Sequence, residues 1–265
     1  MAHPQRGPAP RKRFGQNFLQ DDGVIQAIVR AIAPTADDHV VEIGPGQGAL
    51  TGALVTSGCK LDAIELDRDL TTGLLAAFSI HPRFALHSGD ALTFDFAGLV
   101  DDDKPLRVVG NLPYNISTPL IFKLLANTAL LRDMHFMLQR EVVLRLAAEP
   151  GSKEWGRLGV MTQFHCRVSH LFDVPPEAFF PAPKVQSAIV RLLPHSSTPY
   201  PACNVAHLGR VVQMAFAQRR KTLRNNFKGT FDDSDLIAAG IDPGARAETL
   251  PIEAFVALSA LLDAR

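Results

Sequence analysis

The sequence has few cysteines, and their spacing marks neither a disulfide framework nor a zinc site. Cys59, Cys166 and Cys203 are odd in number, lie far apart and include no Cys-x-x-Cys pair. A disulfide-stapled secreted scaffold is therefore disfavoured, and three reduced thiols in a cytoplasmic protein are expected. The residues suggest no metal site.

Long apolar runs are also missing. No stretch approaches the roughly 20 apolar residues of a membrane span, and residues 1–20 lack the apolar centre of a secretory signal. The 265 residues are 46% hydrophobic and 20% charged, which is ordinary for a soluble globular protein. This length has room for one large domain and a small second one, with no membrane partner.

Net charge is zero, because 27 basic residues balance 27 acidic ones. Their distribution is nevertheless uneven, since neither the residues before Asp21 nor the segment 178–231 contains an acid. These stretches carry the predicted phosphate contacts Lys12, Arg13, Lys184, Arg219, Arg220, Lys221, Arg224 and Lys228. Arg220, Arg224 and Lys228 recur every fourth residue, which predicts one positive helix face for RNA. An ordinary solvated charged face is the alternative.

Short apolar runs alternate with helical patterns along the first half of the chain. Strands are predicted at 39–43, 60–64, 83–87, 106–109 and 133–138. Helices are predicted at 22–32, 49–56, 67–78, 117–127 and 141–148. The alternation favours an α/β fold with a parallel doubly wound sheet.

The later part of the chain changes character. Two runs, 158–172 and 184–193, are predicted to form a terminal antiparallel strand pair. The Pro- and Ser-rich segment 194–201 is a linker by composition. Beyond it the pattern is helical, so we expect a domain over 1–197 with a basic N-terminal arm and a small helical domain over 198–265.

A glycine-rich turn, Gly44-Pro45-Gly46-Gln47-Gly48, follows the first of the predicted strands of the sheet. Such turns let a ligand approach the backbone, although Gly44, Gly46 and Ala49 also fit a dinucleotide pattern. Glu65 ends the next strand and Asp90 the third, where carboxylates can accept hydrogen bonds from ribose hydroxyls and an adenine amino group. Each carboxylate alone is often a capping or turn residue. An adenosine sulfonium and NAD therefore both remain possible here.

Asn111-Leu112-Pro113-Tyr114 follows the fourth strand and favours the sulfonium cofactor, because hydride transfer needs no amide–proline–aromatic clamp. The Asn111 side-chain oxygen and the Leu112 carbonyl can accept both N–H bonds of an adenine N6 group and stabilise the charge that develops there. Pro113 stiffens the turn, and Tyr114 can stack on the base. A plain turn with Tyr114 in the core is the alternative.

A second aromatic pair precedes a proline-rich loop. We expect Phe179 to close on the other face of the base and Phe180 to be a packing residue. Placement of both rings in the core is the competing interpretation.

These motifs resemble the bacterial small-subunit ribosomal RNA adenine N6,N6-dimethyltransferases over most of the chain. The matching segments are 13–19, 42–46, 65–67, 89–90, 111–114, 139–141, 150–151, 179–187 and 218–226. Gln47 and Trp155 depart from the pattern, which usually has an apolar residue and a tyrosine there. The related antibiotic-resistance methylases share mainly the front half.

The resemblance implies a class I methyltransferase fold, Rossmann-like, with S-adenosyl-L-methionine as donor and S-adenosylhomocysteine as product. It implies methylation of two adjacent adenosines near the 3′ end of small-subunit rRNA, within a pre-ribosomal small subunit. By the same resemblance the cofactor contacts fall on Asn17, Leu19, Gly44, Glu65, Asp90 and Asn111. We also expect a monomer. The alternatives are a DNA or large-subunit rRNA adenine N6-methyltransferase, and an assembly or transcription factor that catalyses little.

Overall fold

The computed structural model describes residues 10–11, 16–100 and 104–263. It divides into two compact units, Met1–Val143 with Ser169–Pro194, and Leu144–Val168 with His195–Arg265. The second unit thus takes in residues 144–168 as well as the C-terminal segment. The functional division expected from the sequence, 1–197 and 198–265, stays a prediction.

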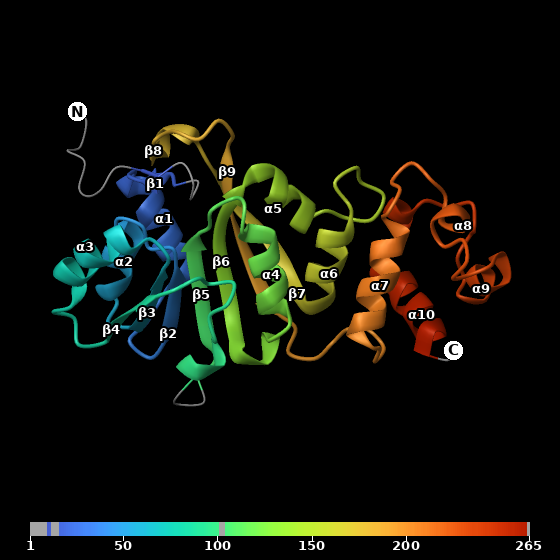
Figure 1. The fold of residues 1–265 in the computed structure, drawn as a ribbon, viewed down its shortest axis with the longest axis horizontal. Helices are drawn as coiled ribbons and strands as arrows, with labels where there is room; N and C mark the ends of the chain where they lie inside the picture. The colour runs from blue at the N-terminus through green and yellow to red at the C-terminus, as the bar shows by residue number, and fades with distance from the viewer. Residues whose placement is uncertain (1–9, 12–15, 101–103, 264–265) are drawn as a thin grey trace. The chain divides into compact units, whose positions relative to one another are not determined.

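A seven-stranded sheet forms the centre of the first unit within the described residues, in the order β4-β3-β2-β5-β6-β9-β7 (Figure 1). Its strands are β2 (His39–Ile43), β3 (Lys60–Glu65), β4 (Phe84–Ser88), β5 (Leu106–Asn111), β6 (Leu131–Gln139), β7 (Cys166–Val174) and β9 (Ser187–Pro194). The first five in this order pair in parallel, and β9 pairs antiparallel with β6. The expected α/β fold with a mostly parallel sheet is confirmed.

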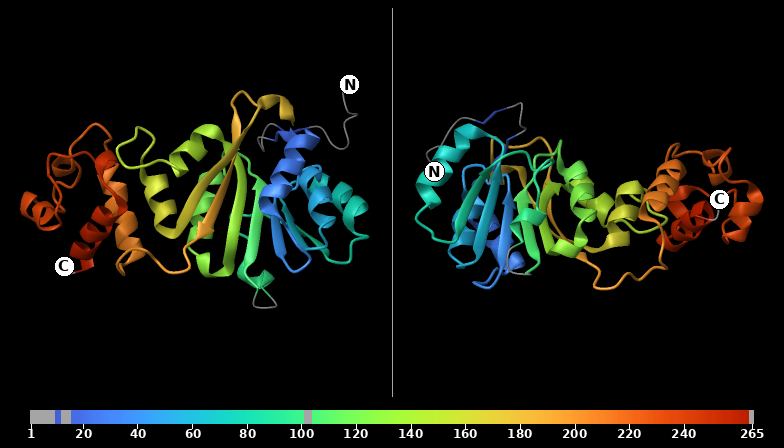
Figure 2. Two further views of the ribbon diagram at one scale, coloured as in Figure 1. Left: turned by 180° about the vertical axis from the view of Figure 1, so that it is seen from behind. Right: turned by 60° about the horizontal axis from the view of Figure 1, so that its bottom comes forward.

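Helices cover both faces of this sheet. They are α1 (Asp22–Ile32), α2 (Ala49–Val55), α3 (Arg68–Phe78), α4 (Ser117–Leu125) and α5 (Arg140–Leu146). Asp21 caps helix α1, since its side chain accepts a hydrogen bond from the Val24 amide, and the helix buries Ile25, Ile28 and Ile32 at helical spacing. The views from the front and from behind place α1 and α4 on opposite faces of the sheet (Figures 1 and 2).

A separate two-stranded ribbon joins the N-terminal segment to the loop before β9. β1 (Phe18–Leu19) pairs antiparallel with β8 (Phe179–Phe180), so that Phe18 lies opposite Phe180 and Leu19 opposite Phe179. Neither strand is predicted from the sequence, because two residues are too few to show a period.

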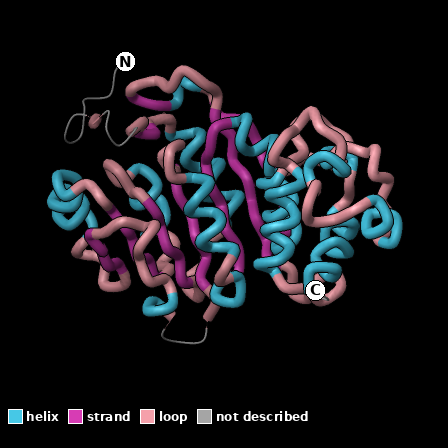
Figure 3. Tube along the Cα trace, turned by 45° about the vertical axis from the view of Figure 1, so that its right-hand side comes forward, coloured by secondary structure: helices cyan, strands magenta, loops and turns pink. Residues whose placement is uncertain are grey.

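The prediction of one strand over 158–172 is wrong for the first half of that run. Arg157–His165 is helix α6, and the strand starts only at Cys166. The helix buries six of its nine residues, five of them in one run, so it shows no amphipathic stripe and cannot be told from a buried strand by pattern. Figure 3 shows where helix gives way to strand and loop along the chain.

Helices are the main elements of the second unit. They are α6, α7 (Val205–Ala215), α8 (Leu223–Asn226), α9 (Asp233–Ala238) and α10 (Ile252–Asp263), and α7 packs against α10.

Short 3₁₀ turns occur in both units, at Ala97–Leu99, Thr128–Leu130, Pro176–Ala178 and Ala247–Thr249. Among the described residues, no helix combines the length and apolarity that crossing a membrane requires.

The prediction that one basic helix carries Arg220, Arg224 and Lys228 is wrong. Helix α7 ends at Ala215, turns follow, and α8 holds only four residues. The Asn226 side chain donates hydrogen bonds to the carbonyls of Ala215 and Gln218, which folds the chain back between the two helices.

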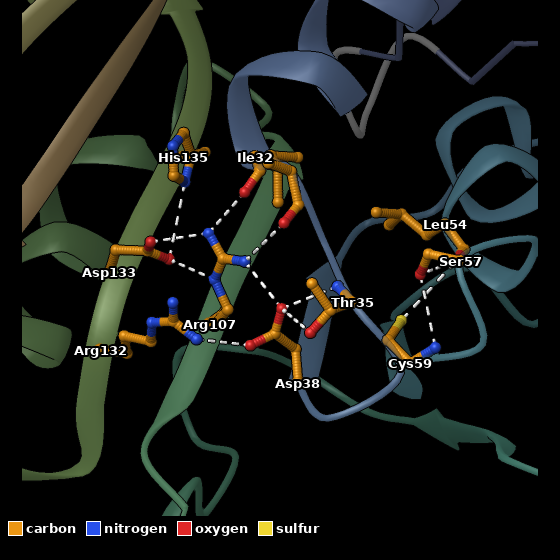
Figure 4. A network of polar contacts seen from close by, with 11 residues as sticks. Ile32, Thr35, Asp38, Leu54, Ser57, Cys59, Arg107, Arg132, Asp133 and His135 are labelled. Atoms are coloured by element: carbon orange, nitrogen blue, oxygen red, sulfur yellow. Dashed lines mark hydrogen bonds and ion pairs between the residues drawn. The ribbon is translucent and has the colours of Figure 1, made fainter.

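A buried ion network ties the amino ends of the strands to the end of α1 (Figure 4). Arg107 donates to Asp133 through Nε at 3.0 Å and a terminal nitrogen at 2.8 Å, and to Asp38 at 3.0 Å. It also donates to the Ile32 carbonyl, one of the last of helix α1, at 2.6 Å. Burial raises the pKa of Asp38, but hydrogen bonds from Thr35 and Arg107 outweigh this effect and hold that pKa below its usual value.

We expect Arg107→Met to lower the free energy of unfolding by about 3–5 kcal/mol, because the buried carboxylate of Asp133 loses its arginine partner and that of Asp38 loses one of two. Arg132→Ala is the matched control. Arg132 also pairs with Asp38, but its side chain is 57% exposed, so about 0–1 kcal/mol is expected. Denaturant titration of both variants measures the difference, and equal losses would contradict the account.

Candidate active site

One cavity of about 140 Å³ lies at the carboxyl edge of the sheet. In open parallel sheets this edge is where ligands bind. The lining includes ten of the residues predicted from the sequence, Asn17, Leu19, Gly44, Gly46, Glu65, Asp90, Asn111, Leu112, Pro113 and Tyr114. The structure therefore brings together residues that span nearly a hundred positions of the chain.

The glycine turn after β2 forms one wall of the cavity. Gly44 and Gly46 have φ angles of 66° and 61°, which side chains other than glycine rarely adopt. A Cβ on Gly46 would also lie 3.1 Å from the Phe18 ring. The turn thus leaves its backbone open towards the cavity, as a ligand-binding turn requires.

Glu65, at the end of β3, is buried and held by the backbone. One carboxylate oxygen accepts from the Gly46 amide at 3.1 Å and the other from the Asp67 amide at 2.8 Å. Burial raises the pKa of Glu65, and the nearby charge of Asp67 adds to the rise. Because a carboxylate has about four acceptor positions, acceptor capacity remains for hydroxyl donors of a ligand.

Asp90 is fixed by the loop that follows β4. Its Oδ1 accepts from the Leu92 amide at 2.9 Å. Lys123 of α4 donates to the carbonyls of Ala91 and Phe94 at 3.0 and 2.5 Å, so the helix after Tyr114 supports the loop that carries Asp90.

The carboxamide of Asn111 has a defined orientation. Its Nδ2 donates to the backbone carbonyl of Asn17 at 3.0 Å. A carbonyl can only accept, so the amide nitrogen must face Asn17 and the side-chain oxygen is the group left to accept from a ligand N–H. This is the orientation that the predicted role of Asn111 needs.

The rest of the motif is held equally well. The Leu112 amide donates to the Met137 carbonyl at 3.2 Å, which fixes the peptide at the end of β5. The Tyr114 hydroxyl and Ser187 Oγ lie 2.9 Å apart, within hydrogen-bond distance. Tyr114 is therefore anchored to the start of β9, and burial raises its pKa despite this contact.

The N-terminal segment closes one side of the cavity, and spacing arguments alone miss its role. Gln16 donates to Asp67 at 2.9 Å, Arg11 pairs with Asp67 and Asp69, and Phe18 packs against α3. Only the family resemblance singles out Asn17 and Leu19; Gln16 and Phe18, which also line the cavity, lie in the same matching segment, but no role is predicted for them.

Phe179 and Phe180 face opposite ways. Phe179 is buried, 5% exposed, in the core beside α1, and it is not among the cavity-lining residues. Its role on a base stays a prediction. The expected packing role of Phe180 is wrong, because its side chain is 41% exposed. Alternation along β8 explains the difference, since neighbouring side chains of a strand point to opposite faces.

Two further ionisable residues line the cavity, Glu42 of β2 and His135 of β6. Glu42 accepts from the Thr51 hydroxyl at 2.6 Å, and burial with the charge of Glu65 raises its pKa to about 7. Burial lowers the pKa of His135 to about 4. Glu42 was detectable in the sequence as one charge inside a buried apolar strand, whereas His135 gave no signal beyond its strand.

The predicted RNA contacts have mixed surroundings. Lys12 and Arg13 lie outside the described residues, and Lys184 is exposed in the first unit. Arg219 pairs with Glu248 and Arg224 with Asp233, so folding supplies acids that the local sequence lacks. The exposed basic residues of the second unit also include Arg220, Lys221 and Lys228. Their role in RNA binding stays a prediction.

Comparison with known proteins identifies clear relatives. The profile of the family described as ribosomal RNA adenine dimethylase matches residues 8–264. Proteins named ribosomal RNA small subunit methyltransferase A are similar in *Chromohalobacter salexigens* and *Pseudomonas aeruginosa*, at 60% and 59% identity. The alignments cover 94% of this chain in both cases, and 90% and 93% of the relatives.

Two solved structures share the fold over nearly the whole chain. A dimethyladenosine transferase from *Plasmodium falciparum* superposes with a TM-score of 0.78 at 25% identity, covering 93% of this chain and 98% of that one. The 23S rRNA methyltransferase ErmE gives 0.72 at 25% identity, covering 93% and 100%.

We expect Glu42→Gln to remove a pH-dependent loss of stability. The folded pKa of Glu42, about 7, lies above its ordinary 4.5, so the wild type loses stability relative to the variant as pH rises from about 4.5 to 7. The change is up to roughly 3 kcal/mol. Urea titrations of both proteins between pH 4.5 and 8 test this, and a constant difference across that range would contradict it.

Proposed function

Because the chain belongs to the ribosomal RNA adenine dimethylase family, we propose that it methylates N6 of two adjacent adenosines near the 3′ end of small-subunit rRNA, giving N6,N6-dimethyladenosines. The protein is an S-adenosylmethionine-dependent methyltransferase. The observation that carries the proposal is the orientation of the Asn111 carboxamide, in a cavity that also holds Glu65 and Asp90.

The residues present fit this donor, which supplies a methyl group already activated on a positively charged sulfonium. Glu65 has acceptor positions for two ribose hydroxyls, and Asp90 for an adenine amino group. The positive-φ glycines give backbone access, and Asn17 and Leu19 lie on the same cavity. Four carboxylates at or beside the cavity, Glu42, Glu65, Asp67 and Asp90, suit a cationic ligand.

Asn111 and Leu112 prepare the target nitrogen. The N6 lone pair of adenine is delocalised into the ring, and two carbonyl-type acceptors on its N–H bonds favour a pyramidal nitrogen. The Asn111 Oδ1 and the Leu112 carbonyl then stabilise positive charge on N6 as the methyl group arrives. Tyr114, anchored by Ser187, stacks on the base and holds it in line. The alkylated nitrogen is acidic, so no strong base and no metal are required.

RNA presents such a base only when it is unpaired or flipped out of a helix. We therefore infer that the target adenosines lie in an unpaired segment of folded rRNA within a pre-ribosomal small subunit. We also propose that the protein acts as a cytoplasmic monomer. Residues 1–197 would hold cofactor and base, and the helices of 198–265 would contact rRNA. The names of relatives at 58–60% identity favour small-subunit rRNA over the 23S target of the more distant ErmE.

Incubation with purified unmodified small subunits and methyl-labelled cofactor tests the function. Mapping of the modified nucleotides is expected to find two adjacent dimethyladenosines near the 3′ end of the rRNA. Label on large subunits or DNA only would overturn the assignment.

We expect Asn111→Ala to lower the rate of methyl transfer at saturating substrates by about 10²- to 10³-fold, as loss of one preorganised polar group does in other enzymes. Binding of small subunits should not change. Asn127→Ala, which removes an exposed amide after α4, is the control and should retain full activity. Unreduced transfer by the Asn111 variant would exclude the proposed role.

We expect Arg220→Ala to reduce by about 1 the slope of log binding constant against log salt concentration, because one phosphate contact is lost. Lys153→Ala removes an exposed positive charge from the same unit and should leave the slope unchanged. Filter-binding measurements across a salt series compare the two. Equal slopes for Arg220→Ala and the wild type would show that Arg220 does not contact an RNA phosphate.

A further inference from the structure

An exposed apolar loop follows β8. We call residues 180–186 the rim loop. Phe180 and Val185 are 41% and 44% exposed, and Pro181, Ala182 and Lys184 are exposed as well. A large aromatic side chain on the surface gives up the free energy that burial would provide, so its position calls for an explanation by contact with something else.

Both ends of the rim loop are attached to the wall of the cavity. At its start, Phe180 pairs with Phe18, which lines the cavity. Directly after its end, Ser187 lies 2.9 Å from the hydroxyl of Tyr114, another lining residue. β1 and β8 lie together, and the chain runs from β8 through this loop into β9 (Figure 1). The rim loop therefore borders the cavity.

The register of the ribbon sets the direction of the Phe180 ring. Residues directly opposite each other in an antiparallel pair point to the same face. Leu19 and Phe179 share the face that packs into the core beside α1, so Phe18 and Phe180 share the other face. Phe18 contributes to the cavity wall, as its neighbour Leu19 does from the other face, and Phe180 lies opposite Phe18 in the ribbon and is exposed.

The charge of the rim loop selects the kind of partner. Lys184 is exposed, and the rim loop itself contains no acidic residue. An aromatic ring and a positive side chain on one loop are the combination that binds unpaired nucleotides, since the ring stacks on a base and the cation contacts a phosphate.

We propose that Phe180 is a second stacking site, which holds the nucleobase adjacent to the adenosine in the cavity, with Lys184 against the backbone phosphate. This inference rests on the proposed function and deepens it. A substrate with two neighbouring adenosines places one base outside the cavity whenever the other is inside. Phe180 stacks on that outer base and keeps it next to the cavity until it is methylated in its turn.

Phe180→Ala tests the site. Loss of one base stack is expected to raise the KM for small subunits about tenfold, with the transfer rate at saturation and the Kd for S-adenosylmethionine unchanged. Phe180→Trp should retain wild-type KM, and Phe180→Leu, apolar but not aromatic, should lose as much as alanine. Ile80→Ala removes another apolar side chain of the first unit, 82% exposed, and should change nothing. A leucine variant equal to wild type, or an alanine variant with weakened cofactor binding, would overturn the proposal.

A double-mutant cycle separates stacking from packing. The probe is an RNA hairpin whose loop carries the two adenosines, either intact or with one of them replaced by an abasic nucleotide. Wild-type protein should lose about tenfold in affinity for the abasic RNA, and Phe180→Ala should lose nothing further. Additive losses would overturn the stacking role. Because this assay reads binding only, it is distinct from the labelling test, where failure of the wild type to modify small subunits would count against the proposed function itself.

Discussion

The common direction of the parallel strands is the constraint on which the site depends. β2, β3, β4 and β5 all end at one edge, so the glycine turn, Glu65, the Asp90 loop and Asn111 meet there although they are far apart in sequence. A ligand at this edge meets backbone groups and side chains that need no further arrangement. Strand β9 runs antiparallel to β6, so its first residue, Ser187, lies at the same edge, where it anchors Tyr114.

The amino ends of the strands lie at the opposite edge of the sheet, and the contacts there stabilise the fold. There Arg107 joins β5, β6, the start of β2 and the end of α1 through buried charged hydrogen bonds. These contacts fix the strand that carries Asn111 at its far end and the helix that packs beneath the cavity. The ion network and the predicted site thus lie at opposite ends of β5, and His135, which lies 3.7 Å from Asp133 and also lines the cavity, stands between them.

Sequence patterns predicted the parts that have a clear period or a special backbone. The alternation of strands and helices, the glycine turn and the carboxylates at strand ends all follow from local rules, and they occupy one cavity in the structure. Patterns failed where burial removed the period, as in Arg157–His165, and where side-chain amides redirected the chain, as at Asn226. The Asn17–Asn111 contact joins residues 94 positions apart through a backbone carbonyl, and no residue type announces such a partner.

The carboxylates of the cavity link binding to turnover. Burial raises the pKa values of Glu42 and Glu65, which means that their charged forms are poorly solvated in the free protein. A cationic ligand improves their environment, so the cavity attracts a sulfonium more strongly than a neutral thioether of the same shape. Once the methyl group has left, that attraction disappears while the proposed contacts to ribose and adenine remain. The electrostatic part of the binding energy is therefore present for the donor and absent for the product, which favours exchange of product for donor between the two methylations of each adenosine.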